Sequence, residues 1–329
     1  MKSPHQHVPP YRAPAWLPGG HAQTLYPLTR RGPLPHYRRE RWDAPDGDFI
    51  DIDWLAAGTG TSEPQVVPLV VLFHGLEGSS RSHYARALMH TLARRGWAGA
   101  VPHFRGCSGE PNRLPRAYHS GDSAEIDWVL RRMRARFPQR PLFAAGVSLG
   151  GNALLKWLGE QEEGARDVVQ AAAAVCAPLD LTAAGYALQR GFNLIYTRNF
   201  LVTLKANSLA KLERFPGLFD RGRMLAAKTL YDFDDAVTAP LHGFRDAKDY
   251  WLRASSKPWL PGVRVPALLV NALNDPFLPA QALPNGRQVS SAVTLDYPAG
   301  GGHAGFVCGP FPGQIDWLPH RLLTFFAGS

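Results

Sequence analysis

A serine flanked by glycines lies where a short apolar stretch of the chain gives way to an amphipathic one. Residues 146–150 read GVSLG, with Ser148 at the centre. The preceding stretch 141–147, PLFAAGV, is typical of a strand that is buried on both faces. The apolar residues of 149–158 recur at the three- and four-residue intervals of one helix face. Ser148 is therefore expected at the corner between a strand and a helix.

This pattern matches the G-x-S-x-G turn, in which a serine hydroxyl is exposed as a nucleophile. The sharp turn strains the serine backbone, and the flanking glycines remove Cβ atoms that would clash across it. The N–H groups that begin the following helix point toward any oxyanion formed there. The bare pattern also arises by chance, so its place between a strand and a helix is what supports Ser148 as the nucleophile.

A serine hydroxyl needs a general base, and the base needs an acid that holds it. In a strand-turn-helix architecture of this kind the acid and then the base follow the serine, each after a later strand. Asp275 comes directly after the apolar stretch 267–274, and His303 lies in the glycine-rich sequence GGGHAGF. We therefore predict a catalytic triad of Ser148, His303 and Asp275.

Other aspartates offer alternatives for the acid of this triad. Asp180 follows the apolar stretch 168–178, which is a position that also lies at the end of a strand. Asp234 and Asp235 fall in the segment 179–260, which lacks strand patterns. Asp275 is preferred because it follows a later strand and precedes His303, which is where the order serine, acid, histidine places the acid.

The oxyanion formed in such a reaction needs two hydrogen-bond donors. One is expected to be the backbone N–H of Leu149, directly after the nucleophile. The second is expected from the loop HGLEG at 74–78, which follows the apolar stretch 66–73, with the N–H of Leu76 as the donor. The alternative interpretation of HGLEG is a plain glycine turn.

The elements that must position these residues follow a regular alternation. From residue 66 onward, apolar stretches typical of strands alternate with amphipathic helical stretches such as 82–96 and 123–137, and the chain ends on a helical stretch. This predicts a single α/β domain over residues 1–329, with a mainly parallel sheet flanked by helices. The alternation stops over 179–260, where a helical, basic pattern predicts an inserted cap.

Residues 1–65 are expected to form an N-terminal extension and the first strands. Asp46-Gly47 lies between two candidate strands and predicts a hairpin. The aspartates of 41–58 lack the order of a calcium-binding EF-hand loop, so they are interpreted as part of a solvated hairpin.

Composition places the chain among ordinary globular proteins. Its 329 residues are 45% hydrophobic and 19% charged, and no apolar stretch reaches the length of a membrane span. The first residues lack the apolar core of a signal peptide, so a cytoplasmic location is expected. The net charge of +9 comes from dispersed arginines without a nucleic-acid motif, so no nucleic-acid partner is expected. Contact with an anionic membrane surface or an acidic substrate stays open, as does the oligomeric state.

Cysteine and histidine patterns predict neither a cysteine nucleophile nor a metal site. Cys107, Cys176 and Cys308 are odd in number and lack metal spacing, and Cys107 lies in a glycine turn with no assigned base. His21, His74, His103 and His119 show no paired ligand spacing on a helix. We expect no cofactor.

With these residues in place, the chain resembles the α/β-hydrolase superfamily, and within it the YheT-like family. Plant embryogenesis-associated hydrolases and some eukaryotic lipid-cleaving hydrolases belong to the same wider family. The resemblance covers about residues 13 to 325. It is carried by GHAQT at 20–24, HGLEGSSRSHY at 74–84, FRGCSGEPNR at 104–113, YHSGD at 118–122, GVSLGGN at 146–152, FDDAVTAPLHGFRDAKDYW at 233–251, NDPFLP at 274–279 and GGHAGF at 301–306.

The resemblance implies the triad already predicted and the hydrolysis of carboxylic esters or acyl lipids through an acyl-enzyme. Two alternatives remain open at this stage. An acyltransferase or thioesterase would use the same triad, and a non-catalytic module of the same fold would only bind a ligand. The cap aromatics Phe192, Tyr196 and Phe200 are consistent either with an acyl pocket or with plain cap core.

Overall fold

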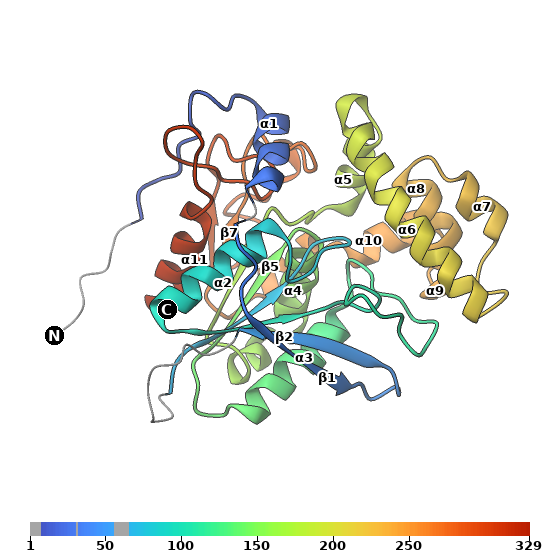
Figure 1. Cartoon of the computed structure of the whole chain (residues 1–329), viewed down its shortest axis with the longest axis horizontal. Coiled ribbons are helices and arrows are strands. Elements are labelled where there is room, and N and C mark those ends of the chain that lie inside the picture. Colours follow the sequence, from blue (N-terminus) through green and yellow to red (C-terminus); the bar gives the residue numbers. More distant parts are fainter. Residues whose placement is uncertain (1–7, 31, 56–65) are drawn as a thin grey trace.

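A twisted sheet with helices on both faces forms the centre of the molecule (Figure 1). The computed structural model describes residues 8–30, 32–55 and 66–329, so the start of the N-terminal extension and the connection at 56–65 lie outside the described residues. Among the described residues the sheet has eight strands in the order β1-β2-β4-β3-β5-β6-β7-β8. The strands are β1 (Tyr37–Asp43), β2 (Phe49–Leu55), β3 (Leu69–Phe73), β4 (Ala98–Pro102), β5 (Leu142–Val147), β6 (Ala171–Val175), β7 (Ala267–Val270) and β8 (Val293–Asp296).

The strands from β4 to β8 pair in parallel, and only the pairs β1–β2 and β2–β4 are antiparallel. The mainly parallel sheet predicted from the alternation is thus confirmed. The β1–β2 hairpin turns through Asp46-Gly47, as predicted, with Asp43 opposite Phe49 in the register.

Successive side chains of the central strands face opposite layers of helices. Leu69, Val71 and Phe73 of β3 belong to the core under α3 (Ser123–Arg136) and α4 (Leu149–Gln161). Val70 and Leu72 belong to the core under α2 (His83–Arg95) and α11 (Trp317–Ala327). This alternation is why the strands read as continuous apolar stretches, because both of their faces are buried.

Between β6 and β7 the chain forms helices instead of a further strand. They form a layer of their own beside the sheet, at the right of Figure 1, with a small core that includes Leu201, Met224 and Phe233. No helix in the described part of the chain is both long and apolar enough to cross a bilayer. The helices are α5 (Leu181–Leu188), α6 (Leu194–Arg214), α7 (Arg221–Ala226), α8 (Leu230–Phe233), α9 (Ala239–Leu241) and α10 (Ala247–Ala254).

The interpretation of the hairpin aspartates as solvated holds for Asp43 and Asp46, which are exposed, and is wrong for the other three. Asp48, Asp51 and Asp53 are all buried, and each is held by cations or hydrogen-bond donors. Arg39 and Arg41 of β1 pair with the residues directly opposite them in β2, Asp53 and Asp51, at 2.7 and 2.8 Å. Two arginines that contribute to the positive charge of the sequence therefore neutralise buried carboxylates instead of facing a partner.

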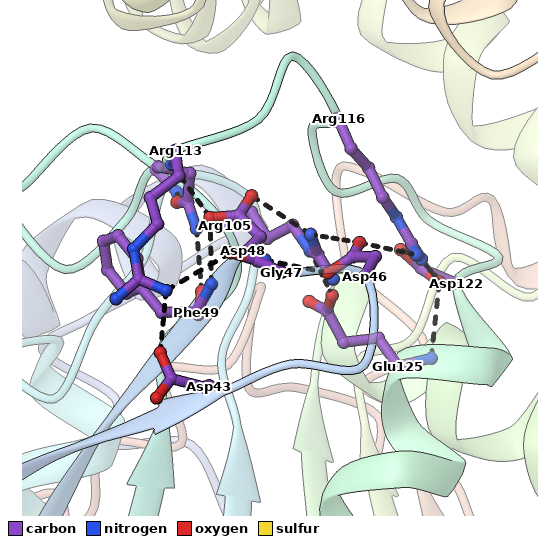
Figure 2. A network of polar contacts seen from close by, with 12 residues as sticks. Asp43, Asp46, Gly47, Asp48, Phe49, Arg105, Arg113, Arg116, Asp122 and Glu125 are labelled. Carbon is purple, nitrogen blue, oxygen red and sulfur yellow. Dashed lines mark hydrogen bonds and ion pairs between the residues drawn. The ribbon is translucent and has the colours of Figure 1, made fainter.

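One buried arginine holds the hairpin against the loop that follows β4. Figure 2 shows the Arg105 side chain among Asp46, Asp48 and Glu125. Its Nη1 donates to Asp46 at 2.8 Å and to Asp48 at 3.1 Å, and its Nε donates to Glu125 at 2.6 Å. Asp48 also accepts hydrogen bonds from the Asn112 side chain and from the N–H of Arg113. This network fixes the loop of residues 103–122.

Replacing Arg105 by methionine is expected to lower the free energy of unfolding by about 3–5 kcal/mol, because Asp48 and Glu125 would remain buried without their cation. Chemical denaturation of the variant and the wild type measures this loss of unfolding free energy. The matched control is Arg113→Met, whose partner Asp43 is 75% exposed, so its loss is expected to cost less than about 1 kcal/mol. Equal losses in the two variants would contradict this interpretation of the network.

Candidate active site

The predicted nucleophile lies at the carboxyl edge of the sheet, between β5 and α4. Ser148 adopts a φ of 53° and a ψ of −123°, a backbone conformation that is strained for any residue other than glycine. Its N–H is held at 2.8 Å by the carbonyl of Val175 on the neighbouring strand. The turn therefore has the strained backbone that a G-x-S-x-G nucleophile needs.

The glycines around Ser148 allow α4 to lie directly against the strands. A Cβ atom on Gly150 would come within 2.5 Å of the carbonyl oxygens of Phe73 and His74. A Cβ atom on Gly146 would come within 2.5 Å of the carbonyl oxygen of Gly150. Both obstacles are backbone atoms, so no side-chain movement would relieve the clash. Close packing of backbone on backbone is what sets the direction of the Ser148 side chain.

The predicted base and acid are brought together in the structure. His303 Nδ1 lies 2.9 Å from Asp275 Oδ2 and 3.2 Å from Oδ1. Asp275 is buried, and its Oδ1 also accepts the N–H of Phe277. The imidazole of His303 stacks on the Phe277 ring with centroids 4.0 Å apart. Two hydrogen bonds and a ring contact therefore set the orientation of His303 and Asp275.

The alternative acids lie elsewhere. Asp180 caps α5, where its side chain accepts the N–H of Ala183 at 3.0 Å. Asp234 binds the side chains of Thr238 and Trp251 in the wall of the cavity, and Asp235 forms an ion pair with Arg223.

Ser148 and His303 line one cavity of about 430 Å³, together with both predicted oxyanion donors. No hydrogen bond joins Ser148 to His303 among the described residues, an arrangement that is common before a substrate is bound. The N–H of Leu149, as the first residue of α4, has no acceptor within the helix. Leu76 lies in the loop after β3, which also borders the cavity.

The loop that carries Leu76 is held by a tyrosine. The Tyr118 hydroxyl accepts the N–H of Glu77 at 2.9 Å and donates to the Glu77 carboxylate at 2.7 Å. The other carboxylate oxygen of Glu77 accepts the side-chain N–H of Asn207 in α6. Glu77 has a φ of 53°, and burial raises the pKa of its carboxyl. The peptide that follows Leu76 is thus fixed from two sides.

A short N-terminal helix holds the loop that carries His303. In α1 (Gly20–Leu25), the Gln23 side-chain oxygen accepts the N–H of Gly301 at 2.8 Å, and the Thr24 hydroxyl accepts the N–H of His303 at 2.9 Å. Asn274, next to the predicted acid, donates to the same Gln23 oxygen at 2.9 Å. These residues belong to the sequence GHAQT at 20–24, which carries the family resemblance but shows no chemical motif. No local pattern connects residues so far apart along the chain.

Several histidines that were weighed as metal ligands have protein partners. The two ring nitrogens of His74 contact the carbonyl of Gly75 at 2.8 Å and the N–H of Phe104 at 3.1 Å, and burial lowers the pKa of His74 to about 3. His103 contacts Asp53 at 2.8 Å and the carbonyl of Cys107 at 3.2 Å. His21 contacts the hydroxyl of Tyr196, and His119 accepts the N–H of Gly121.

One group with metal-ligand chemistry occurs in the described part of the chain, formed by Cys176, Asp275 and His303 with ligand atoms within 4.8 Å of one another. Burial and the nearby Asp275 raise the pKa of the Cys176 thiol well above its usual value, which opposes the thiolate that a metal would bind. Burial also raises the thiol pKa of Cys107 and that of Cys308, the latter to about 11. Raised pKa values do not suit cysteine nucleophiles.

Comparisons with known proteins agree with this architecture. Residues 68–310 match the family model described as the alpha/beta hydrolase fold. The chain is 39% identical over 307 residues to the Escherichia coli K12 protein YheT, which is provisionally named an esterase, covering 92% of this chain and 88% of YheT. It is 29% identical over 320 residues to the human phospholipase ABHD3, covering 96% and 78% of the two chains.

A solved structure shows the same fold at low sequence identity. The Pyrococcus furiosus esterase PF2001 superposes with a TM-score of 0.56 and 14% identity, covering 97% of each chain. Because the family model covers about three quarters of the chain and YheT is near 40% identical along most of its length, the chain belongs to the α/β-hydrolase fold family and is a relative of YheT within it.

Proposed function

We propose that this protein is a serine hydrolase that cleaves carboxylic esters with acyl or lipid-like chains. The observation that carries the proposal is one cavity that contains Ser148 at a strained turn and His303 bonded to the buried Asp275. The names of the relatives, an esterase and a phospholipase, support the same class of reaction.

In the proposed mechanism, Ser148 Oγ attacks the ester carbonyl while His303 Nε2 accepts the serine proton. Asp275 holds the Nδ1–H side of the imidazole and stabilises its protonated form. The N–H groups of Leu149 and Leu76 bind the oxyanion, and His303 returns the proton to the departing alcohol. Water then attacks the acyl-serine in the same way, which releases the carboxylic acid and restores the hydroxyl.

The walls of the cavity support an acyl chain as the substrate's main feature. Side chains from the helices between β6 and β7 form much of the wall, and most of them are apolar, including Leu181, Leu188, Phe200, Leu204, Leu230 and Phe233. Three acids also border the cavity. Glu110 forms an ion pair with Arg41, and burial raises the pKa of Glu77 and that of Asp234, the latter to about 6. Raised pKa values reduce the negative charge that Glu77 and Asp234 present to an apolar chain.

The same proposal treats residues 179–260 as a cap on a single domain that spans residues 1–329. Phe200 of this cap lines the cavity, Tyr196 is buried against Phe277 with ring centroids 4.8 Å apart, and Phe192 is exposed. The three aromatics that the sequence left undecided therefore have three different environments.

Ser148→Ala is expected to lower kcat by about 10⁴- to 10⁶-fold, because no other hydroxyl would have a base aligned with it. The assay is hydrolysis of p-nitrophenyl esters from acetate to palmitate, with unfolding measured on the same preparations. Ser291→Ala removes an exposed serine that does not line the cavity and serves as the control with wild-type turnover. Wild-type kcat in a folded Ser148→Ala protein would rule out the mechanism.

Asp275→Asn is expected to lower kcat by about 10⁴-fold, since an amide would present its N–H or a neutral oxygen to His303 Nδ1 in place of a carboxylate. Asp180→Asn is the matched control, because asparagine is an equally good N-cap for α5 and the residue has no contact with His303. The ester assay ranks the two variants. A larger loss in Asp180→Asn would transfer the acid role to that residue.

Thr24→Val is expected to lower kcat by about tenfold or more at little change in KM, because the N–H of His303 loses its acceptor and the imidazole shifts relative to Ser148. Thr24→Ser keeps the hydroxyl and is expected to restore the turnover. The pH profile of kcat separates positioning from a general loss of stability. Identical profiles and rates in the valine and wild-type proteins would exclude a positioning role for Thr24.

A further inference from the structure

Residues 181–212 of the cap carry positive charge without any negative charge. Residues 181–212 contain no aspartate or glutamate, whereas Arg190, Arg198, Lys205 and Lys211 carry positive charge. Lys205 and Lys211 bind backbone carbonyls within the molecule. Arg190 and Arg198 are exposed, and neither forms an ion pair with any residue in the described part of the chain. Their charge is therefore directed to the solvent.

An apolar stripe lies between these two arginines and continues beyond them. Val202 is 71% exposed, Ile195 49% and Phe192 47%. Ile195 and Val202 lie two turns apart on one face of α6, with the exposed residues Arg198 and Asn199 between them, and Phe192 lies in the short 3₁₀ turn Gly191–Asn193 that precedes α6. The opposite face of α6 is packed inward, with Tyr196, Thr197 and Leu201 buried. Exposed large apolar residues gathered beside arginines mark a contact surface.

The stripe continues onto α1 from the other end of the chain. The ring of His21 lies 4.5 Å from that of Phe192, and its Nδ1 contacts the Tyr196 hydroxyl at 3.2 Å. Leu25, one turn beyond His21, is exposed as well. Figure 1 shows α1 and the start of α6 on the same side of the molecule. Two segments far apart in sequence thus form one apolar surface.

This surface lies next to the proposed reaction centre. His303 stacks on Phe277, Phe277 contacts Tyr196, and Tyr196 contacts Phe192 with ring centroids 6.1 Å apart. In addition, Phe200 and Leu204 of α6 line the cavity that contains Ser148. One helix therefore has an inner side that faces the cavity and an outer side that presents the apolar stripe.

We propose that Leu25, Phe192, Ile195 and Val202, with Arg190 and Arg198, form a docking surface for an anionic lipid bilayer. Apolar side chains flanked by arginines, with no acidic residue in the segment, are complementary to the hydrocarbon boundary and phosphate groups of such a surface. The described helices do not span a membrane, so the contact is peripheral. Docking here would bring lipid esters to the side of the cavity.

Vesicle flotation with the full chain tests the docking surface directly. Wild-type protein is expected to float with vesicles of equal phosphatidylglycerol and phosphatidylcholine and to bind pure phosphatidylcholine much more weakly. The double variant Ile195→Glu/Val202→Glu is expected to lose about tenfold or more in partitioning, because it places charge in the apolar stripe. Leu252→Glu is the matched control, since Leu252 is 67% exposed on α10, outside the stripe.

The charged part of the surface is tested with Arg190→Gln/Arg198→Gln. We expect about a fivefold loss of partitioning to the anionic vesicles for each arginine removed, and a weaker dependence on salt. Arg221→Gln, an exposed arginine of α7, is the control and is expected to bind as the wild type does.

Several outcomes would overturn the proposal. These are a wild type that binds neither vesicle, glutamate variants that bind unchanged, or loss of binding in Leu252→Glu to the same extent. Analytical ultracentrifugation is run on the same proteins. A wild-type dimer that becomes monomeric in Ile195→Glu/Val202→Glu would assign the surface to a second copy of the chain.

Turnover of soluble p-nitrophenyl acetate separates this proposal from the proposed function. None of the substituted residues lines the cavity, so each variant is expected to keep wild-type turnover. Binding without turnover would leave the docking surface standing and contradict the esterase proposal. Turnover without binding to vesicles would support the esterase proposal and contradict the docking surface.

Discussion

The structure of the candidate site depends on one close contact between backbones. Helix α4 begins so near to β3 and β5 that the hydrogen atoms of Gly146 and Gly150 occupy space where any Cβ would collide with main-chain atoms. Because β5 ends at Val147 and α4 begins at Leu149, the chain has one residue in which to reverse its direction. That residue is Ser148, and its positive φ follows from this geometry. The free N–H of Leu149 is a consequence of the same tight turn.

The surrounding loops are held by polar side chains that each connect two segments of the chain. Arg105 joins the hairpin to the loop after β4, and Tyr118 of that loop in turn holds the peptide after Leu76. The cavity wall is therefore connected to buried charges at the other end of the loop. In a low-dielectric interior such charges are favourable only in a narrow range of geometries, so they confer order on segments that have little secondary structure.

The sheet, the nucleophile turn and the hydrogen-bonded pair of Asp275 and His303 could be predicted from the sequence, because each depends on local patterns. Apolar stretches identified the strands, and G-x-S-x-G identified the turn. The chain order after Ser148 indicated which later residues to consider. The burial of Asp48, Asp51 and Asp53 could not be predicted in this way, since aspartates in a hairpin look solvated unless the arginines opposite them in the fold are known. The contacts of Gln23 and Thr24 with the His303 loop could not be predicted from local patterns either, because they join opposite ends of the chain.

Those last contacts also affect the order in which the protein is completed during synthesis. Thr24 and His303 are 279 residues apart, so α1 leaves the ribosome long before its partner loop exists. Until then the Thr24 hydroxyl has the carbonyl of Gly20 as a local partner, and the Gln23 amide has that of Leu17. The loop around His303 can acquire its hydrogen bonds to Gln23 and Thr24 only when the two ends of the chain meet. The proposed reaction centre is therefore complete only when both ends of the chain are in place.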